Sequence, residues 1–258
     1  MTVEFGISEA LAPWPLTGRG VELQRGLEAL ASGTFSGIAV RGPSGVGRSR
    51  LAAELVSSLE AAHGSAIRVV ASATARLVPL GPFRHLAAEE EDATENESEP
   101  RTASMPELVD RLRRRIERLG PVVVFVDDAH WLDEASLILL AQLTHIKNVR
   151  IVLTSSSGAA VPDGLAALSR TDSFFRIDIS AFDFDQTGAL LRAALGGMID
   201  GRAEYLLFHA SGGLPLLLRE TVRTARDAGV LCRVEGVWRI QGPLPVARRA
   251  TELAAAQL

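Results

Sequence analysis

A glycine-rich segment carries the clearest chemistry in this sequence. Residues 42–49 read Gly-Pro-Ser-Gly-Val-Gly-Arg-Ser, which fits the pattern G-x-x-x-x-G-K-[ST] at every fixed position except the lysine, where Arg48 stands. Glycines allow successive backbone N–H groups to turn inward around phosphate oxygens, because no side chain blocks the approach. A helix that begins directly after the segment would add the partial positive charge of its N-terminus. The segment therefore predicts a phosphate-binding loop of the P-loop type.

Individual residues of this loop have distinct predicted roles. Ser49 occupies the position that ligates Mg²⁺, and Arg48 occupies the position whose cation reaches the outer phosphates. The residues assigned to nucleotide binding are those of the loop and the one after it: Gly42, Pro43, Ser44, Gly45, Val46, Gly47, Arg48, Ser49 and Arg50. A tight bend would also explain the glycines, but the segment lies between an expected strand and an expected helix, as phosphate binding requires.

Two adjacent carboxylates supply the second chemical element. Asp127 and Asp128 follow a run that is apolar at every position from Val122 to Val126. Carboxylates at the carboxyl end of a parallel strand face the crevice in which open α/β sheets bind ligands. We predict that Asp127 holds Mg²⁺ through its water shell and that Asp128 orients or polarises an attacking water. The predicted catalytic residues are Asp128 and Arg48. Taken alone, the aspartates would equally suit a helix-capping turn.

Strands and helices alternate around these residues. Apolar runs predict five strands, over 37–41, 67–71, 121–126, 149–154 and 174–179. Helical spacing predicts helices over 23–30, 49–62, 105–119 and 134–146, the last capped by Asp133. This alternation indicates an α/β fold, a three-layer P-loop NTPase with a parallel five-stranded sheet.

The pattern becomes helical after about residue 180. Helices are expected over 186–195, 202–210 and 216–228, and they would form a small helical lid. Two strands, over 230–234 and 237–240, flank Glu235-Gly236 and predict a hairpin, with a short helical stretch up to Leu258. The expected domains are therefore a leader and first helix in 1–35, a core in 36–180, the lid in 181–229, and a closing region in 230–258.

Composition excludes several classes of protein. A chain of 258 residues with 47% apolar residues can bury the core of one large domain. The single cysteine, Cys232, excludes an internal disulfide and a cysteine-based zinc cluster, which favours a reducing compartment. No segment reads as a signal peptide or a bilayer-spanning helix, so we expect a cytoplasmic protein with no membrane partner.

The charge pattern argues against direct DNA binding. The net charge of −4 gives no global positive field. The arginine cluster at residues 111–115 is interleaved with Glu107, Asp110 and Glu117 at helical spacings that allow neutralising pairs. We expect a solvated helix face there. Seven acidic residues and no basic one between Glu89 and Glu99 predict an acidic mobile loop over 88–104, with an acidic partner-binding segment as the alternative.

Four motifs in this order resemble those of the STAND class of signal-transducing ATPases. They are Leu16-Thr-Gly-Arg-Gly-Val-Glu-Leu23, the glycine loop, Val126-Asp-Asp-Ala-His-Trp-Leu-Asp133 and Gly212-Gly-Leu-Pro-Leu216. The resemblance covers nearly the whole chain and is closest to the ATPase module of large LuxR-type transcriptional regulators. It implies an AAA-type switch module that binds ATP or ADP with Mg²⁺, in which Gly18 and Arg19 lie beside the adenine and Pro215 lies near the base and phosphates. Read without the family, Arg19 is a surface charge and Pro215 starts a helix.

The resemblance also implies partners outside this sequence. A C-terminal sensor and a DNA-binding region would follow residue 258, and residues 230–258 would include the start of a winged-helix-like region. Nucleotide-dependent self-association is compatible with this interpretation. Relatives usually carry lysine where this chain has Arg48. Many also carry a polar or arginine sensor after the fourth strand, where this chain has Thr154-Ser155-Ser156-Ser157 and no nearby positive charge. Weak hydrolysis is therefore expected, and the alternatives are a non-hydrolysing ADP-locked scaffold and an oligomeric AAA-type motor.

Overall fold

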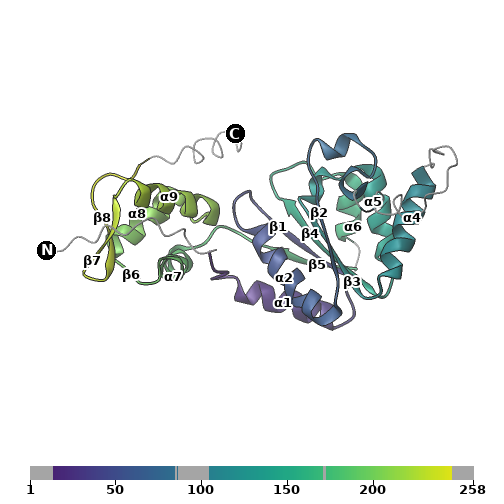
Figure 1. The fold of residues 1–258 in the computed structure, drawn as a ribbon, viewed down its shortest axis with the longest axis horizontal. Coiled ribbons are helices and arrows are strands. Elements are labelled where there is room, and N and C mark those ends of the chain that lie inside the picture. Colours follow the sequence, from purple (N-terminus) through teal and green to yellow (C-terminus); the bar gives the residue numbers. More distant parts are fainter. Residues whose placement is uncertain (1–13, 85, 87–104, 171–172, 246–258) are drawn as a thin grey trace, which may run out of the picture. The chain divides into compact units, whose positions relative to one another are not determined.

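The chain folds into two compact units. The computed structural model describes residues 14–84, 86, 105–170 and 173–245. Of the described residues, one unit, here called the α/β unit, comprises those in 22–42 and 48–178; the other, the helical unit, comprises 14–21, 43–47 and 179–245 (Figure 1). The loop at 43–47 thus groups with the helical unit, although the strand before it and the helix after it belong to the α/β unit.

The α/β unit is built on a five-stranded parallel sheet with the order β2-β3-β4-β1-β5. Its strands are β1 Gly37–Gly42, β2 Ala66–Val70, β3 Val122–Asp127, β4 Val149–Ser156 and β5 Phe174–Asp178. The three inner strands are almost entirely buried, as parallel strands covered on both faces must be. The parallel order places the carboxyl ends of β1, β3 and β4 at the same edge.

Helices cover both faces of this sheet and complete the predicted three-layer fold (Figure 1). The helices of the unit are α1 Gly20–Ala31, α2 Arg48–His63, α4 Met105–Arg118, α5 Glu134–Leu143 and α6 Asp163–Arg170. Helix α2 packs on β1, β3 and β4, while α4, α5 and α6 enclose the apolar core on the other face. The predicted cap of α5 is confirmed, because the Asp133 carboxylate accepts a hydrogen bond from the Ser136 N–H at 3.1 Å.

Some predicted boundaries differ from the structure. Helix α5 ends at Leu143, three residues earlier than expected, because 144–146 already turn toward β4. Helix α6 was not predicted at all; among its residues whose burial is described, only Leu165 and Leu168 are buried, and two apolar positions give too weak a periodic signal. The acidic loop expected at 88–104, residues 1–13 of the expected leader and residues 246–258 of the expected closing region lie outside the described residues.

The arginine-rich helix α4 forms the ion pairs that its spacing predicts. The Arg113 guanidinium contacts Asp110 at 3.0 Å and Glu117 at 3.0 Å, and Arg114 contacts Asp110 at 3.1 Å. The buried face of α4 consists of Val109, Leu112 and Ile116. The basic residues therefore form a partly neutralised solvated face.

The helical unit has its own core and a small sheet. Its elements are α7 Phe184–Leu195, β6 Met198–Ile199, α8 Gly201–Ser211, α9 Pro215–Asp227, β7 Leu231–Val234 and β8 Val237–Ile240. The strands pair in the order β6-β8-β7. The predicted hairpin is present, and both turn residues, Glu235 and Gly236, have positive φ angles of 51° and 81°, as a tight hairpin turn requires. The two-residue β6 was too short to predict.

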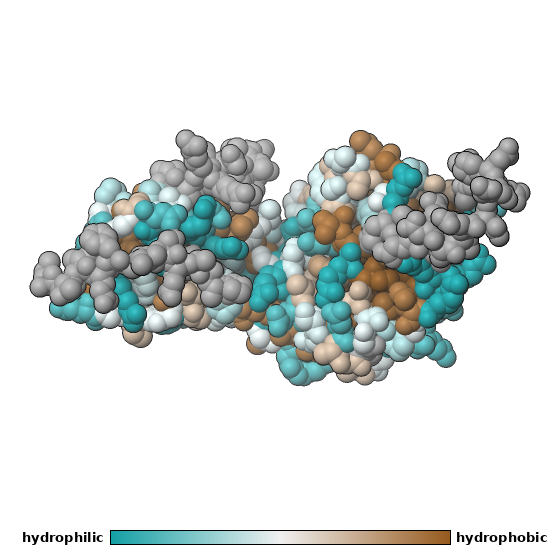
Figure 2. Space-filling model, in the orientation of Figure 1, coloured by the Kyte–Doolittle hydropathy of each residue, from teal (hydrophilic) through white to brown (hydrophobic). Residues whose placement is uncertain are grey.

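The surface of the α/β unit is mixed in polarity. Figure 2 shows hydrophobic residues between hydrophilic ones on the visible face, and the most exposed large apolar side chains include Leu77 and Val70. Scattered exposure of this kind is ordinary for a folded domain, and we assign no binding role to it. Among the described residues, no helix is both long enough and apolar enough to cross a bilayer.

Candidate functional site

The glycine loop has the backbone conformation that its sequence predicts. It follows β1 directly and leads into α2, which begins at Arg48. Gly45 and Gly47 have φ angles of 78° and 98°, in the left-handed region where any side chain would be strained. Val46 between them is 1% exposed, which anchors the turn. The loop thus joins a buried parallel strand to a helix N-terminus, the arrangement in which backbone N–H groups hold anions.

Arg48 is directed into the protein at this helix N-terminus. Its side chain is 10% exposed, and its guanidinium donates to the Gly42 carbonyl at 2.6 Å and to Asp128 Oδ1 at 3.0 Å. The planar guanidinium suits two simultaneous acceptors of this kind. Arg48 therefore fastens the start of α2 to the ends of β1 and β3.

A hydrogen-bonded set of oxygens lies beside Arg48. Ser49 Oγ donates to Asp127 Oδ1 at 2.8 Å, and Thr154 Oγ1 donates to the same oxygen at 2.5 Å. The Thr154 hydroxyl also accepts the Asp128 N–H at 2.8 Å. Thr154 is fully buried, so this one hydroxyl fixes both aspartates at the end of β3. We refer to Ser49, Asp127, Asp128 and Thr154 as the oxygen cluster.

Asp128 has an unusual backbone conformation within this cluster. Its φ and ψ angles are 53° and 45°, and it caps the 3-10 helix Ala129–Trp131. Aspartate is one of the few residues other than glycine that adopts this left-handed conformation, at a cost of about 1 kcal/mol or more. The turn directs the Asp128 carboxylate toward Arg48 instead of continuing the strand.

His130 is held in its neutral form behind the aspartates. It is 6% exposed, and its Nδ1 accepts the Ser156 N–H at 3.4 Å, so the proton of the neutral ring is on Nε2. Burial lowers the pKa of His130 below its ordinary value of 6.5; Asp128, 3.9 Å away, opposes this shift. His130 therefore contributes packing and an acceptor rather than a positive charge.

The remaining loop residues are placed as follows. Arg50 is exposed and forms an ion pair with Glu54 at 3.6 Å, one turn further along α2. Pro43 is half-buried and Ser44 is exposed. None of these side chains is hydrogen-bonded to the oxygen cluster among the described residues, so their predicted part in nucleotide binding stays a prediction.

The predicted adenine-side residues lie in the helical unit. Arg19 is 4% exposed, its guanidinium donates to the Ser180 carbonyl, and its Cζ lies 4.4 Å from the centre of the Phe182 ring. The interpretation of Arg19 as a surface charge is therefore wrong, because cation–π stacking and the carbonyl bond hold it in the interior. A side chain at Gly18, whose φ is 81°, would contact Phe182 at 3.4 Å.

Pro215 begins α9, as its position in the first turn of a helix predicts. The next residue, Leu216, donates its N–H to the Gly45 carbonyl at 3.2 Å, and both belong to the helical unit. The Gly212-Gly-Leu-Pro-Leu216 motif is thus hydrogen-bonded to the glycine loop. Within the α/β unit, hydrogen bonds join Arg48, Ser49 and the two aspartates.

Sequence reasoning left Thr154 and His130 without an assigned role. The usable signal for Thr154 was its place at the end of a strand beside β3, since the ends of neighbouring parallel strands converge. His130 had no such signal, because a histidine after an acidic pair is more often a packing residue.

The sequence matches a known protein family. The profile of the AAA ATPase domain family matches residues 15–153, which is more than half of the chain and includes the glycine loop and both aspartates. The chain belongs to the AAA ATPase domain family. No curated protein matches the sequence.

Solved structures show the same fold as this AAA ATPase domain. The Orc1 protein of Aeropyrum pernix in complex with DNA has a TM-score of 0.61 at 20% identity, with 95% of this chain and 66% of that one covered. A Walker-type ATPase of Pyrococcus abyssi has a TM-score of 0.56 at 17% identity, with 93% and 73% covered. A variant of RuvB from Thermotoga maritima has a TM-score of 0.55 at 19% identity, with 94% and 72% covered. The AAA ATPase domain thus spans about two thirds to three quarters of the length of these proteins.

The oxygen cluster of this AAA ATPase domain fits a magnesium ion shared with a ligand. Ser49 Oγ and Asp127 Oδ1 are hard oxygen donors 2.8 Å apart, and Mg²⁺ prefers one or two carboxylates together with phosphates and waters. No group of three or more histidine, cysteine or acidic side chains among the described residues could hold a metal without such a ligand. The donor set therefore suits a metal that arrives with a phosphate.

Proposed function

We propose that this AAA ATPase domain binds ATP or ADP together with Mg²⁺. The observation that carries the proposal is the 2.8 Å hydrogen bond between Ser49 Oγ and Asp127 Oδ1, next to a glycine loop with left-handed Gly45 and Gly47. The bond brings the first residues of α2 and the end of β3 to one point, although the two side chains are far apart in the sequence. A phosphate in the loop would accept hydrogen bonds from its backbone N–H groups, and a divalent cation beside it would be held by the oxygens of Ser49 and Asp127.

Each residue has a defined part in this proposal. The backbone N–H groups of 42–49 hold the phosphates, and Ser49 and Asp127 hold Mg²⁺, which when bound neutralises charge on the phosphate oxygens. Gly18, Arg19 and Pro215 contribute to the adenine side, in keeping with the STAND motifs. The Leu216–Gly45 hydrogen bond supports this role for Pro215, since it ties the start of α9 to the phosphate loop.

Hydrolysis is proposed to be slow. In hydrolysis, a water oxygen forms a bond to the γ-phosphorus, the bond to the β-phosphate oxygen breaks, and ADP and phosphate are released. Asp128 is placed to orient that water, but its carboxylate is engaged by Arg48 at 3.0 Å. Arg48 itself is bound to the Gly42 carbonyl, which restrains it from following the migrating phosphoryl group.

A non-hydrolysing scaffold that retains ADP is the second candidate function. The Arg48–Asp128 pair favours it, because the pair occupies the two groups on which turnover would depend. The two candidates agree on nucleotide binding and differ only in turnover. Both are compatible with a cytoplasmic switch module of a larger transcriptional regulator, whose sensor and DNA-binding regions would lie outside this sequence and which could self-associate when nucleotide binds.

Calorimetry with ATP and ADP in the presence of Mg²⁺ tests the binding proposal. Gly47→Val should abolish binding, because its side chain is strained at φ 98° and the loop must rearrange. Gly64→Val is the matched control: Gly64 has a φ of 92°, also faces open space, and lies at the other end of α2. Folded wild-type protein that binds neither nucleotide would refute the proposal, and undiminished binding by Gly47→Val would move the site elsewhere.

Nucleotide content and turnover separate the two candidates. Purified protein is denatured and its released nucleotide is identified by chromatography, while phosphate release is followed with added ATP. Tightly retained ADP without phosphate release supports the scaffold, and measurable release supports a slow ATPase. Gel shifts at moderate salt should show no sequence-selective DNA complex, because Arg113 and Arg114 of α4 are paired with acidic residues of the same helix.

A further inference from the structure

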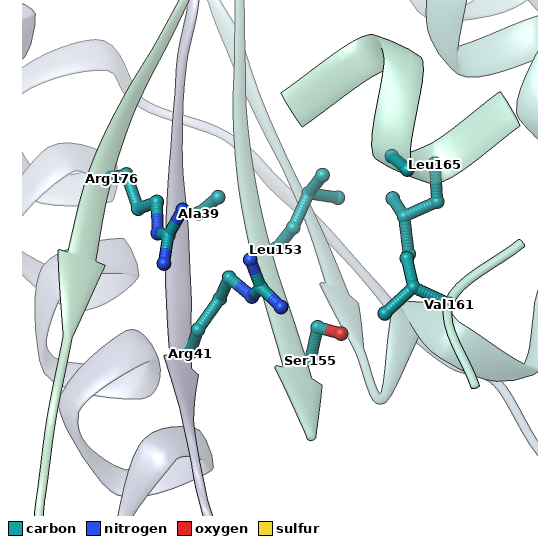
Figure 3. Close-up of a pocket in the computed structure, with 8 residues that line it drawn as sticks. Ala39, Arg41, Leu153, Ser155, Val161, Leu165 and Arg176 are labelled. Carbon is teal, nitrogen blue, oxygen red and sulfur yellow. The ribbon is translucent and has the colours of Figure 1, made fainter. Parts of the chain in front are cut away.

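A pocket lies on the α/β unit, on the face of the sheet that α6 covers. Its volume is about 270 Å³, and it is lined by Ala39, Arg41, Leu153, Ser155, Val161, Leu165, Ala166 and Arg176 (Figure 3). The pocket is below the range of about 300–1,000 Å³ that is typical of drug-sized ligands, which indicates a small occupant. Two guanidinium groups line it, and none of the described lining residues carries a carboxylate.

The pocket is separate from the oxygen cluster, although one strand contributes to both. Thr154 and Ser155 are consecutive residues of β4, so their side chains point to opposite faces of the sheet. The Thr154 hydroxyl is bonded to the aspartates, whereas Ser155 lines the pocket. An occupant of this pocket would therefore lie behind the sheet, away from the proposed nucleotide.

Ser155 presents a buried hydroxyl to this pocket. The residue is 7% exposed, and its Oγ has no hydrogen-bond partner among the described residues. Buried hydroxyl groups nearly always have a partner, because an unsatisfied one is costly. The Ser155 hydroxyl can donate one hydrogen bond, and an anionic oxygen is the acceptor that would gain most from the guanidinium groups nearby.

Arg41 is a charged residue on a face of the sheet that otherwise packs against the apolar core. In β1 it lies on the same face as Ala39, which is buried in the apolar core. Its strand neighbours are Ser155 in β4 and Asp178 in β5, yet no ion pair or hydrogen bond of Arg41 is formed with any described residue. Figure 3 shows its guanidinium extending over the sheet between β1 and β4, in the direction of Leu153.

The local charge balance is positive. Arg176 Nε is 2.7 Å from Asp178 Oδ2, and this pair uses the one carboxylate that neighbours Arg41 along the sheet. Arg41 therefore forms no ion pair with any residue in the described part of the chain, while it is half-buried beside apolar side chains. A half-buried guanidinium of this kind is best satisfied by a carboxylate or phosphate, which accepts two parallel hydrogen bonds from it.

We propose that this pocket binds the oxyanion group of a small molecule, either a phosphate or a carboxylate. Arg41 is the principal cation, the Ser155 hydroxyl donates a further hydrogen bond, and Arg176, on the edge strand β5, offsets the negative charge of Asp178, with which it is paired. The apolar side chains of α6 and the preceding loop, among them Val161 and Leu165, limit the remainder of the ligand to a small and partly apolar body. The site is independent of the nucleotide proposal, because none of its residues belongs to the glycine loop or the oxygen cluster.

Titration calorimetry with two probes tests the proposal. Inorganic phosphate and succinate are titrated separately into the full chain, and a millimolar or tighter Kd is expected for at least one of them. Binding of phosphate alone identifies a phosphorylated ligand, and binding of succinate alone identifies a carboxylate. Arg41→Gln and Arg176→Gln should weaken binding about tenfold and about threefold, and Ser155→Ala about threefold, as expected for charged and neutral donors.

Two control variants locate the bound anion. Arg68→Gln removes an exposed strand arginine of the same sheet, which pairs with Glu60, and should leave the affinity unchanged. Arg48→Gln reports on phosphate held by the glycine loop. Weakening by Arg41→Gln and Ser155→Ala, with Arg48→Gln near wild type, supports the pocket.

Three results would overturn the proposal. They are no binding of either probe at about 10 mM, a change of less than about twofold in both Arg41→Gln and Ser155→Ala, or a loss confined to Arg48→Gln. Circular dichroism verifies folding of each variant. Arg176 is more than half exposed, so Arg176→Gln keeps the test decisive if the Arg41 variant does not fold.

Discussion

Replacing Arg48 with lysine should accelerate ATP hydrolysis while leaving nucleotide affinity almost unchanged. Arg48 donates to both the Gly42 carbonyl and Asp128. A lysine ammonium is a compact point charge that cannot reproduce this forked arrangement, so Asp128 would be released while the positive charge near the phosphates is kept. The wild-type chain should turn over more slowly than about 1 per second, the low end for ordinary enzymes.

The size of the effect follows from the Arg48–Asp128 pair. Its atoms are 3.0 Å apart, and the Asp128 side chain is 36% exposed, so solvent partly screens the attraction. We take the pair as worth about 1 kcal/mol after this screening. Releasing Asp128 by that amount raises the fraction of the carboxylate that is free to orient water about fivefold. Turnover should therefore rise about fivefold or more, with Kd within about threefold of wild type.

The assay measures phosphate release and nucleotide affinity on the same preparations. Arg68→Lys serves as the control, because Arg68 is an exposed strand arginine paired with Glu60 outside the proposed site. A wild-type rate near 1 per second or above would show that Arg48 does not impede the chemistry. A turnover in Arg48→Lys that equals or falls below wild type would show that the Arg48–Asp128 pair does not restrain Asp128.

Three further perturbations test the packing and electrostatics around the site. Thr154→Val should lower the free energy of unfolding by about 1–3 kcal/mol in urea titrations, because the Asp128 N–H loses its acceptor; an unchanged midpoint would contradict the bridging role. Gly213→Ala should be several kcal/mol more destabilising than Gly212→Ala, since both have positive φ but only the Cβ at 213 would meet a backbone carbonyl, at 2.0 Å. His130 has a folded-state pKa below its ordinary 6.5, so the unfolded chain binds the proton more readily and stability should fall as the pH drops below about 6.5. His130→Asn should show a shallower fall over the same pH range, and parallel curves would mean that other groups cause it.

The alternating strands and helices of the α/β unit could be predicted because each inner strand is an unbroken apolar run. Residues 122–126 are buried without exception, which only a central parallel strand between two helical layers requires. The five strands and the parallel arrangement are confirmed. Helix α6 could not be predicted, because it is short and few of its described residues are buried, so its formation depends on packing rather than on a periodic sequence pattern.

The residues of the candidate site could be predicted from the sequence, but the hydrogen bonds and ion pairs between them could not. The glycine loop and the two aspartates could be found from motif spacing, since phosphate and metal chemistry restricts which residues can stand there. The direction of the Arg48 side chain could not be read from the sequence, because it depends on a carbonyl and a carboxylate that the fold brings within reach. The burial of Arg19 depends in the same way on Phe182 and Ser180, which are distant in the chain.

The strand order has a consequence for how the chain is made. Strand β1, at residues 37–42, pairs only with β4 at 149–156 and β5 at 174–178, both of which are synthesised much later. In a nascent chain that has emerged only as far as residue 148, β1 therefore lacks both β4 and β5. The residues of β1 that are buried in the folded unit are exposed to solvent at that stage. Closing such a long loop is slow, and exposed strand edges favour aggregation. The centre of the sheet is thus assembled late, and the first half of the α/β unit depends on the second half to become a folded structure.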